Sequence, residues 1–180
     1  MKRTVVAIMA MLITTAGTAA VTLPAQASPN RAGRACSTHW GTAPRHAGAM
    51  VQTRVRNVRA GEHTCFDRLV VDLGVGQAPG FRVGYVRAFF ADGSGQRVPT
   101  KGRAKLLVTV RAPAAASFNA SRRHLVRVAG FAEFRQVAGL GSFEGVTSIG
   151  LGLRGRSAFR VFEVKTAGRR FKLVIDVARH

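Results

Sequence analysis

The sequence predicts an all-β protein of two small sheets that are related by a pseudo-twofold axis and packed as a β-sandwich. Short segments in which polar and apolar residues alternate are separated by glycine-rich turns, and a period of two is typical of half-buried strands. No stretch has the apolar spacing of a long amphipathic helix. Three short phrases also recur in the same order, which indicates that one structural unit is present twice.

The recurring phrases define the predicted repeat. They are Phe66–Val70 with Phe143–Thr147, Phe81–Arg87 with Phe159–Lys165, and Lys105–Val110 with Lys172–Val177. The first two phrases lie 15 residues apart in the early copy and 16 in the late copy, whereas the next gap is 24 residues against 13. We therefore expect copies at about 50–112 and 124–178, with an extra hairpin between Phe89 and Lys105. Chance similarity between valine-rich strands is the alternative.

The predicted elements of the first copy follow from alternation and from turn residues. They are a strand over Val51–Arg56, a turn at Ala60–His63, strands at Phe66–Leu73 and Phe81–Phe90, a hairpin turn at Asp92–Gly95, and a strand at Lys105–Arg111. In the last strand Leu106, Val108 and Val110 are expected to face the core. Ala112–Arg123 is interpreted as the link between the copies, and Leu125–Gln136 as the opening strands of the second copy.

The first 27 residues have the pattern of a secretion signal. Lys2 and Arg3 precede an apolar run over Val5–Ala16, and Ala25–Ala27 is an A-x-A cleavage sequence. We expect residues 1–27 to be removed, with no transmembrane segment after cleavage; a retained anchor is the alternative. Residues 28–49 are expected to be irregular, with Trp40 packed on the edge of the domain. The remaining residues, 50–180, are expected to form the β domain.

Cys36 and Cys65 are the two cysteines of the chain. In an exported protein such a pair predicts one disulfide. It closes a loop of about 30 residues, which stabilises the fold by roughly 3–4 kcal/mol in the chain-entropy model. This bridge would tether the irregular segment to the first strands.

The chain is strongly basic, with 28 Lys and Arg against eight Asp and Glu and a formal net charge of +20. Loss of the signal segment leaves 26 basic residues and a net charge of +18. Such a surface attracts polyanions. Outside the cell these are cell-wall polymers, anionic lipids and acidic glycans, so we do not expect nucleic acid to be the partner. The alternative is that the arginines reflect genome composition and serve solubility.

No sequence motif indicates catalysis, a metal or a cofactor. Gly150–Gly155 matches G-x-G-x-x-G, but no helix pattern follows, so the context of a phosphate-binding loop is missing. The five histidines are scattered without metal-ligand spacing. Asp67 and Glu144 occupy corresponding positions in the repeat, which favours a structural role. We expect a non-enzymatic protein without cofactor or metal.

Several phrases resemble the AMIN-like domain of secreted actinobacterial proteins over about Trp40 to Val177. They are Val55–His63 with Cys65–Leu73, Gly141–Gly145, Phe159–Phe162, Leu173–Val177 and the upstream Trp40–Gly41. The chain departs from the family at Ala167–Phe171, where prolines often precede the last strand. The resemblance implies two symmetry-related sheets and, through the related AMIN domains, a non-catalytic role in targeting proteins to peptidoglycan.

We therefore expect a secreted, non-catalytic envelope-binding module that recognises peptidoglycan or its anionic polymers. The predicted ligand-binding residues are Arg82, Arg160 and Arg68. Alternatively, Arg82 and Arg160 form cross-strand ion pairs with Asp67 and Glu144. Two other functions remain open, a cell-wall hydrolase that uses Asp67, Glu144 or Asp72, and a non-specific cationic binder of extracellular polyanions. The sequence makes no prediction of oligomeric state.

Overall fold

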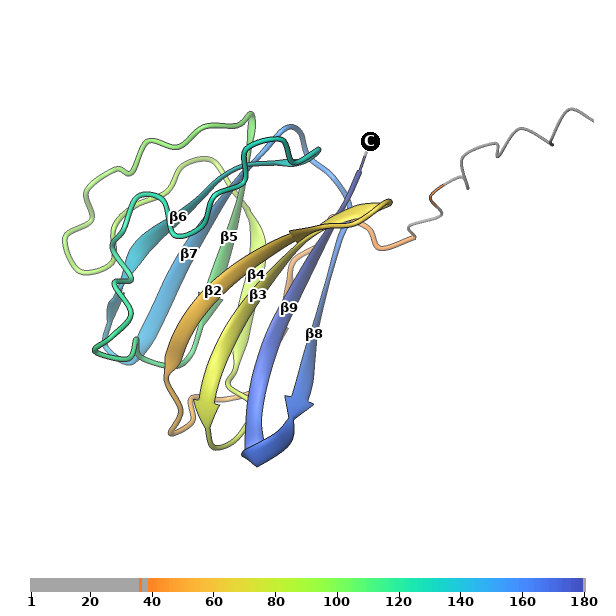
Figure 1. The fold of residues 1–180 in the computed structure, drawn as a ribbon. Coiled ribbons are helices and arrows are strands. Elements are labelled where there is room, and N and C mark those ends of the chain that lie inside the picture. The colour runs from red at the N-terminus through yellow and green to blue at the C-terminus, as the bar shows by residue number, and fades with distance from the viewer. Residues whose placement is uncertain (1–35, 37–38, 180) are drawn as a thin grey trace, which may run out of the picture. The chain divides into compact units, whose positions relative to one another are not determined.

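The computed structural model describes Cys36 and residues 39–179, which form two antiparallel sheets and no α-helix (Figure 1). The predicted signal segment, 1–27, and residues 28–35 lie outside the described residues. The strands are β1 (Arg45–Ala47), β2 (Val55–Glu62), β3 (Phe66–Val75), β4 (Phe81–Val86), β5 (Ala104–Val110), β6 (Phe134–Phe143), β7 (Val146–Leu153), β8 (Phe159–Thr166) and β9 (Arg170–Ala178). A short 3-10 turn, Ala167–Arg169, joins β8 to β9.

The strand orders of the two sheets are related. One sheet has the order β2-β3-β9-β8 and the other has β1-β4-β5-β7-β6. Each of the strands β2 to β5 can be exchanged with the strand four places later in the chain, β6 to β9. The order β2-β3-β9-β8 then becomes β6-β7-β5-β4, which is the second order read backwards without its extra edge strand β1. The operation exchanges the sheets, as a pseudo-twofold axis requires. The predicted all-β, two-sheet architecture is confirmed.

The core lies between the two sheets and takes side chains from both. Leu69, Val71 and Ile175 enter it from the four-stranded sheet, and Leu106 and Val108 enter it from the five-stranded sheet. All five are fully buried. Figure 1 shows β2, β3, β9 and β8 lying across the other sheet, the face-to-face arrangement of a sandwich. The predicted inward alternation in β5 is therefore correct.

Two of the three predicted phrase correspondences agree with the strand pairing. Val83 pairs with Val108 between β4 and β5, and Val161 pairs with Ile175 between β8 and β9. The phrases that equate Val83 with Val161 and Val108 with Ile175 are thus mutually consistent. Arg82 and Arg160, each one residue earlier, also correspond.

The predicted alignment of the first phrase is wrong by three residues. Leu69 lies opposite Ile175, and Ile149 lies opposite Val108. Because Ile175 and Val108 are corresponding positions, Leu69 corresponds to Ile149. Phe66 then corresponds to Val146 and not to Phe143. The reason is that register is set by the inward-facing residues, whereas Phe143 lies at the end of β6 with 54% of its surface exposed.

The two acids that the predicted repeat equates are therefore unrelated by the fold. Asp67 corresponds to Thr147, and both residues are fully buried. Glu144 instead occupies the turn between β6 and β7, where its φ is 47° and the φ of Gly145 is 80°. Gly145 adopts the left-handed backbone of this turn without strain, and Glu144 is exposed beside it, so Glu144 is not a counterpart of buried Asp67.

Other differences concern where strands begin. The first strand is predicted over Val51–Arg56, but β2 starts at Val55 and includes Ala60–Glu62, part of the predicted turn. The reversal occurs after Glu62, where the His63 amide donates to the Phe66 carbonyl at 2.9 Å. Leu125–Gln136 is mostly irregular, because its apolar residues pack on the core without forming a continuous ladder.

The predicted extra length of the first copy lies between β4 and β5. Residues 87–103 make this connection, whereas three residues join β8 to β9. Within the longer connection Phe89 packs over Gly150, where a side chain in place of the glycine hydrogen would bring its Cβ to 2.8 Å from the ring. Phe89, Ala138 and Leu140 form a second apolar cluster. The insertion thus covers the part of the outer face of the five-stranded sheet that β5, β6 and β7 form.

Candidate functional site

The outer face of the four-stranded sheet carries two arginines that share one carboxylate. Arg68 on β3 donates to Asp176 on β9 through Nε at 2.6 Å and through a terminal nitrogen at 2.9 Å. Arg160 on β8 donates to the same carboxylate at 2.8 Å. Asp176 is fully buried beneath the two guanidinium groups, which keep 28% and 43% of their side-chain surface exposed. The three strands bring together Arg68 and Arg160, two of the three predicted ligand residues.

Aromatic rings surround both guanidinium groups. The Arg160 guanidinium carbon lies 4.4 Å from the centre of the Trp40 ring, and that of Arg68 lies 5.0 Å from the centre of Phe66. Both arginines also lie over Phe162. These distances fall in the range of cation–π attraction. We call Trp40, Phe66, Arg68, Arg160 and Phe162, with Asp176 beneath them, the arginine–aromatic cluster.

Trp40 reaches this face because the N-terminal segment is fastened to the sheet. The predicted disulfide between Cys36 and Cys65 is present. The Phe159 amide donates to the carbonyl of Gly41 at 2.9 Å, and Arg45 donates to the carbonyl of Trp40 at 2.7 Å. Part of the segment expected to be irregular is a short edge strand, β1, paired with β4.

The cluster carries a net charge of +1, because two guanidinium groups face one carboxylate. The hydrogen bond to Asp176 raises the pKa of Arg68 further, although burial opposes this shift. A guanidinium has five N–H donors, so both arginines keep N–H groups that Asp176 does not use. The result is an array of flat apolar rings interleaved with hydrogen-bond donors.

Arg82, the third predicted ligand residue, lies away from the cluster. Its strand, β4, belongs to the five-stranded sheet, where Arg82 is exposed and stands opposite His46 and Thr109. No hydrogen bond or ion pair joins its side chain to the described residues. The corresponding positions thus differ in chemistry, since Arg160 stands opposite Asp176.

The alternative ion pairs with Asp67 and Glu144 do not form. Buried Asp67 accepts hydrogen bonds from the backbone amides of Glu133 and Phe134, at 2.7 and 3.0 Å, and lies 3.4 Å from a nitrogen of Arg179. The prediction of ion pairing is correct in kind for Arg160, but the partner is Asp176. Sequence reasoning missed this pair because the repeat comparison does not give the register of β8 on β9, which places Arg160 opposite Asp176.

The three acids named for a hydrolase do not come together in one site, and two of them are already bound to other groups of the protein. Asp67 is buried at one position of β3, whereas Asp72, further along the strand, binds Arg59 in a two-pronged ion pair at 2.7 and 2.8 Å. Glu144 lies in a turn at the end of the other sheet. Across the described ranges, no three His, Cys, Asp or Glu residues are grouped closely enough to hold a metal ion.

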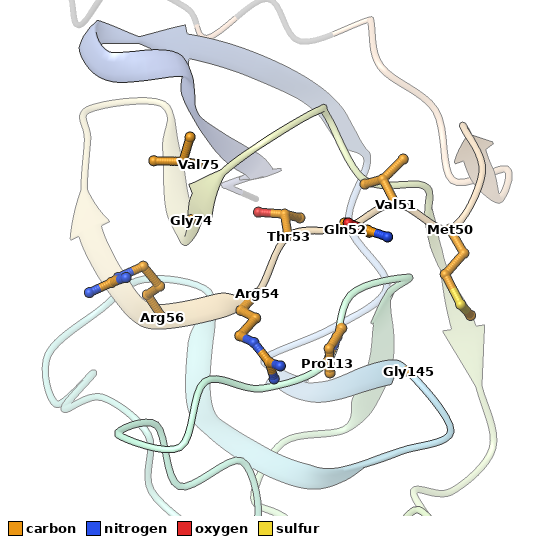
Figure 2. Close-up of a pocket in the computed structure, with 10 residues that line it drawn as sticks. All are labelled: Met50, Val51, Gln52, Thr53, Arg54, Arg56, Gly74, Val75, Pro113 and Gly145. Carbon is orange, nitrogen blue, oxygen red and sulfur yellow. The ribbon is translucent and has the colours of Figure 1, made fainter.

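A separate pocket of about 730 Å³ lies beside the segment that leads into β2 (Figure 2). The residues that line it are Met50, Val51, Gln52, Thr53, Arg54, Arg56, Gly74, Val75, Pro113 and Gly145. In Figure 2 the Arg54 side chain runs towards Pro113, and that of Arg56 extends to the opposite side. None of the lining residues is acidic.

The described residues contain no helix of the length and apolarity needed to cross a membrane.

Similarity to known proteins identifies the family of this chain. No curated protein and no solved structure gave a match to this chain. The AMIN-like domain model, however, matches residues 53–179, which is well over half of the sequence and covers β2 to β9. No catalytic domain was identified beside it. The chain therefore belongs to the AMIN-like domain family.

Proposed function

We propose that this protein is a secreted, non-catalytic module that binds the cell wall, with peptidoglycan or its anionic polymers as ligand. The observation that carries the proposal is the arginine–aromatic cluster on the uncovered face of the four-stranded sheet. Two further facts support it. AMIN domains are linked to peptidoglycan targeting, and the Cys36–Cys65 disulfide suits an extracellular protein.

The chemistry of the cluster suits a glycan. Sugar rings present apolar C–H faces that pack on aromatic rings, and hydroxyl or carboxylate oxygens that accept hydrogen bonds from guanidinium groups. Trp40 and Arg160 together offer both kinds of contact. The Trp40 ring is the apolar surface, and the Arg160 guanidinium beside it keeps donors that Asp176 does not use. Because the disulfide and the hydrogen bonds around Trp40 hold the rings in place, little order has to be gained on binding.

The experiment measures binding of purified protein to peptidoglycan sacculi, with and without their attached anionic polymers. The test variants are Trp40→Ala and Arg160→Gln. Arg82→Gln is the matched control, because it removes the same charge from the corresponding position of the other sheet. Thermal unfolding of each variant shows whether the fold is retained.

We expect each test variant to weaken binding by about tenfold or more, since a charge-assisted hydrogen bond or a buried aromatic contact is worth about 1.5–3 kcal/mol. Arg82→Gln should bind as the wild type does. Equal binding by folded Arg160→Gln, Trp40→Ala and wild type would remove the cluster from the site.

A second candidate function is non-specific attraction of extracellular polyanions. It is favoured by the surplus of basic residues, because the sequence sets 28 Lys and Arg against eight Asp and Glu. Such binding would fall steeply with added salt and would not distinguish between ligands. Sacculus binding at two salt concentrations separates it from recognition by the cluster.

A further inference from the structure

We propose that the pocket of Figure 2 binds the short acidic peptides of the wall polymer, its stem peptides. The pocket would be a second site, in addition to the arginine–aromatic cluster. This inference rests on the proposed function, because it assigns the two moieties of one polymer to two parts of the domain. It requires a pocket of suitable size, unpaired positive charge and an apolar wall.

The backbone around the pocket is held by its own contacts. The Gly74 amide donates to the Arg54 carbonyl at 2.9 Å, and the Val55 amide donates to Pro113 at 2.9 Å. A side chain at Gly76, whose φ is 144°, would bring its Cβ within 2.7 Å of the Gln52 carbonyl oxygen. These contacts fix the backbone of residues 52–55 before a ligand binds, which lowers the entropic cost of binding.

Two unpaired guanidinium groups supply the charge. Neither the Arg54 nor the Arg56 side chain has a hydrogen bond or ion pair to another described residue, in contrast with Arg59, which is held by Asp72. Figure 2 shows that their side chains diverge. Two cations that lie apart suit a peptide with spaced carboxylates better than they suit one compact anion. A planar guanidinium also pairs with a carboxylate through two hydrogen bonds.

The rest of the wall is apolar. Met50 and Val75 expose 55% and 57% of their surfaces, and they are two of the most exposed large apolar residues in the described chain. Val51 and Pro113 extend the same lining. An extended phosphate polymer offers little to such side chains, whereas a peptide with small aliphatic side chains and free carboxylates would bury them.

The experiment compares two ligands that separate the two sites. Intact sacculi carry peptides, whereas sacculi treated with an amidase retain glycan strands without them. The test variant is the double substitution Arg54→Gln with Arg56→Gln. The matched control is Arg122→Gln with Arg127→Gln, which removes the same charge from a second basic cleft of about 390 Å³. Titration calorimetry with soluble stem peptides gives the affinity of the pocket alone.

We expect the test variant to bind soluble stem peptides at least about tenfold more weakly than the wild type. It should bind stripped glycan as the wild type does. The control should match the wild type on both ligands. Substitution of Val75→Ser, which leaves the charge unchanged, should also weaken peptide binding.

Three results would overturn the proposal. They are wild-type affinity of the test variant for stem peptides, an equal loss in the control variant, and preferential binding of wall phosphate polymer or anionic lipid vesicles through Arg54 and Arg56. Failure of the proposed function differs from these, since it would abolish binding to stripped glycan while leaving peptide binding intact.

Discussion

Arg82 and Arg160 hold corresponding positions on the two sheets, yet Arg160 lies opposite the buried carboxylate of Asp176 and Arg82 lies opposite the hydroxyl of Thr109. The backbone is thus nearly twofold where the chemistry is not. The outer faces of the two sheets also differ. The insertion with Phe89 covers part of the outer face of the five-stranded sheet, whereas the outer face of the four-stranded sheet carries the arginine–aromatic cluster.

Asp176→Asn should destabilise the fold by about 2–3 kcal/mol. The change removes the charge that two guanidinium groups share, but both are partly exposed, so the cost stays below the ~3–5 kcal/mol of a fully buried pair. Asp72→Asn is the control, because its partner Arg59 is half exposed and such pairs contribute about 0–1 kcal/mol. Denaturant unfolding measures both, and equal effects would contradict the prediction.

Replacement of both Cys36 and Cys65 by serine should lower the free energy of unfolding by about 3–4 kcal/mol, since the bridge spans 29 residues and restricts the unfolded chain. Trp40 is the single tryptophan of the sequence. Its fluorescence should therefore report release of the N-terminal segment from Arg160 before global unfolding. An unchanged unfolding midpoint after reduction of the wild type would rule this role out.

Val108→Ala and Ile175→Ala should each cost on the order of 1–4 kcal/mol, through lost transfer energy and the cavity left behind. Both side chains are fully buried at corresponding positions of β5 and β9. Val164→Ala, on the exposed part of β8, should change stability by no more than about 0.5 kcal/mol. Chemical denaturation of the three variants tests whether the two copies contribute alike to one core.

Asp92 should make the fold less stable as the pH rises. Burial raises the pKa of this carboxyl above its ordinary value, although hydrogen bonds from Ser148 oppose the shift. The folded state therefore holds the proton more tightly than the unfolded state, so the stabilisation is present below the unfolded pKa and is lost as pH rises through the folded one. Asp92→Asn removes this dependence.

The measurement is the free energy of unfolding of wild type and Asp92→Asn from about pH 3 to pH 7. The stability of the variant relative to the wild type should increase across this range. A constant difference between the two proteins would show that Asp92 has the same pKa in the folded and unfolded states.

The sequence by itself determined the strands with strict alternation, the disulfide and the place of the insertion. Leu106, Val108 and Val110 are local signals, because each apolar residue marks the inward face wherever the strand lies. Cys36 and Cys65 had no other partner to choose. The family resemblance likewise agrees with the match over residues 53–179.

Register and side-chain partnership were decided only by the tertiary structure. The alignment of Phe66 with Phe143 failed because identical letters do not fix which residues face each other across a sheet. Asp176 could not be assigned to Arg68, 108 residues away, until β3 and β9 were paired. The cluster exists because three strands and a tethered tryptophan meet on one face, and that meeting depends on the cooperative packing of the whole core.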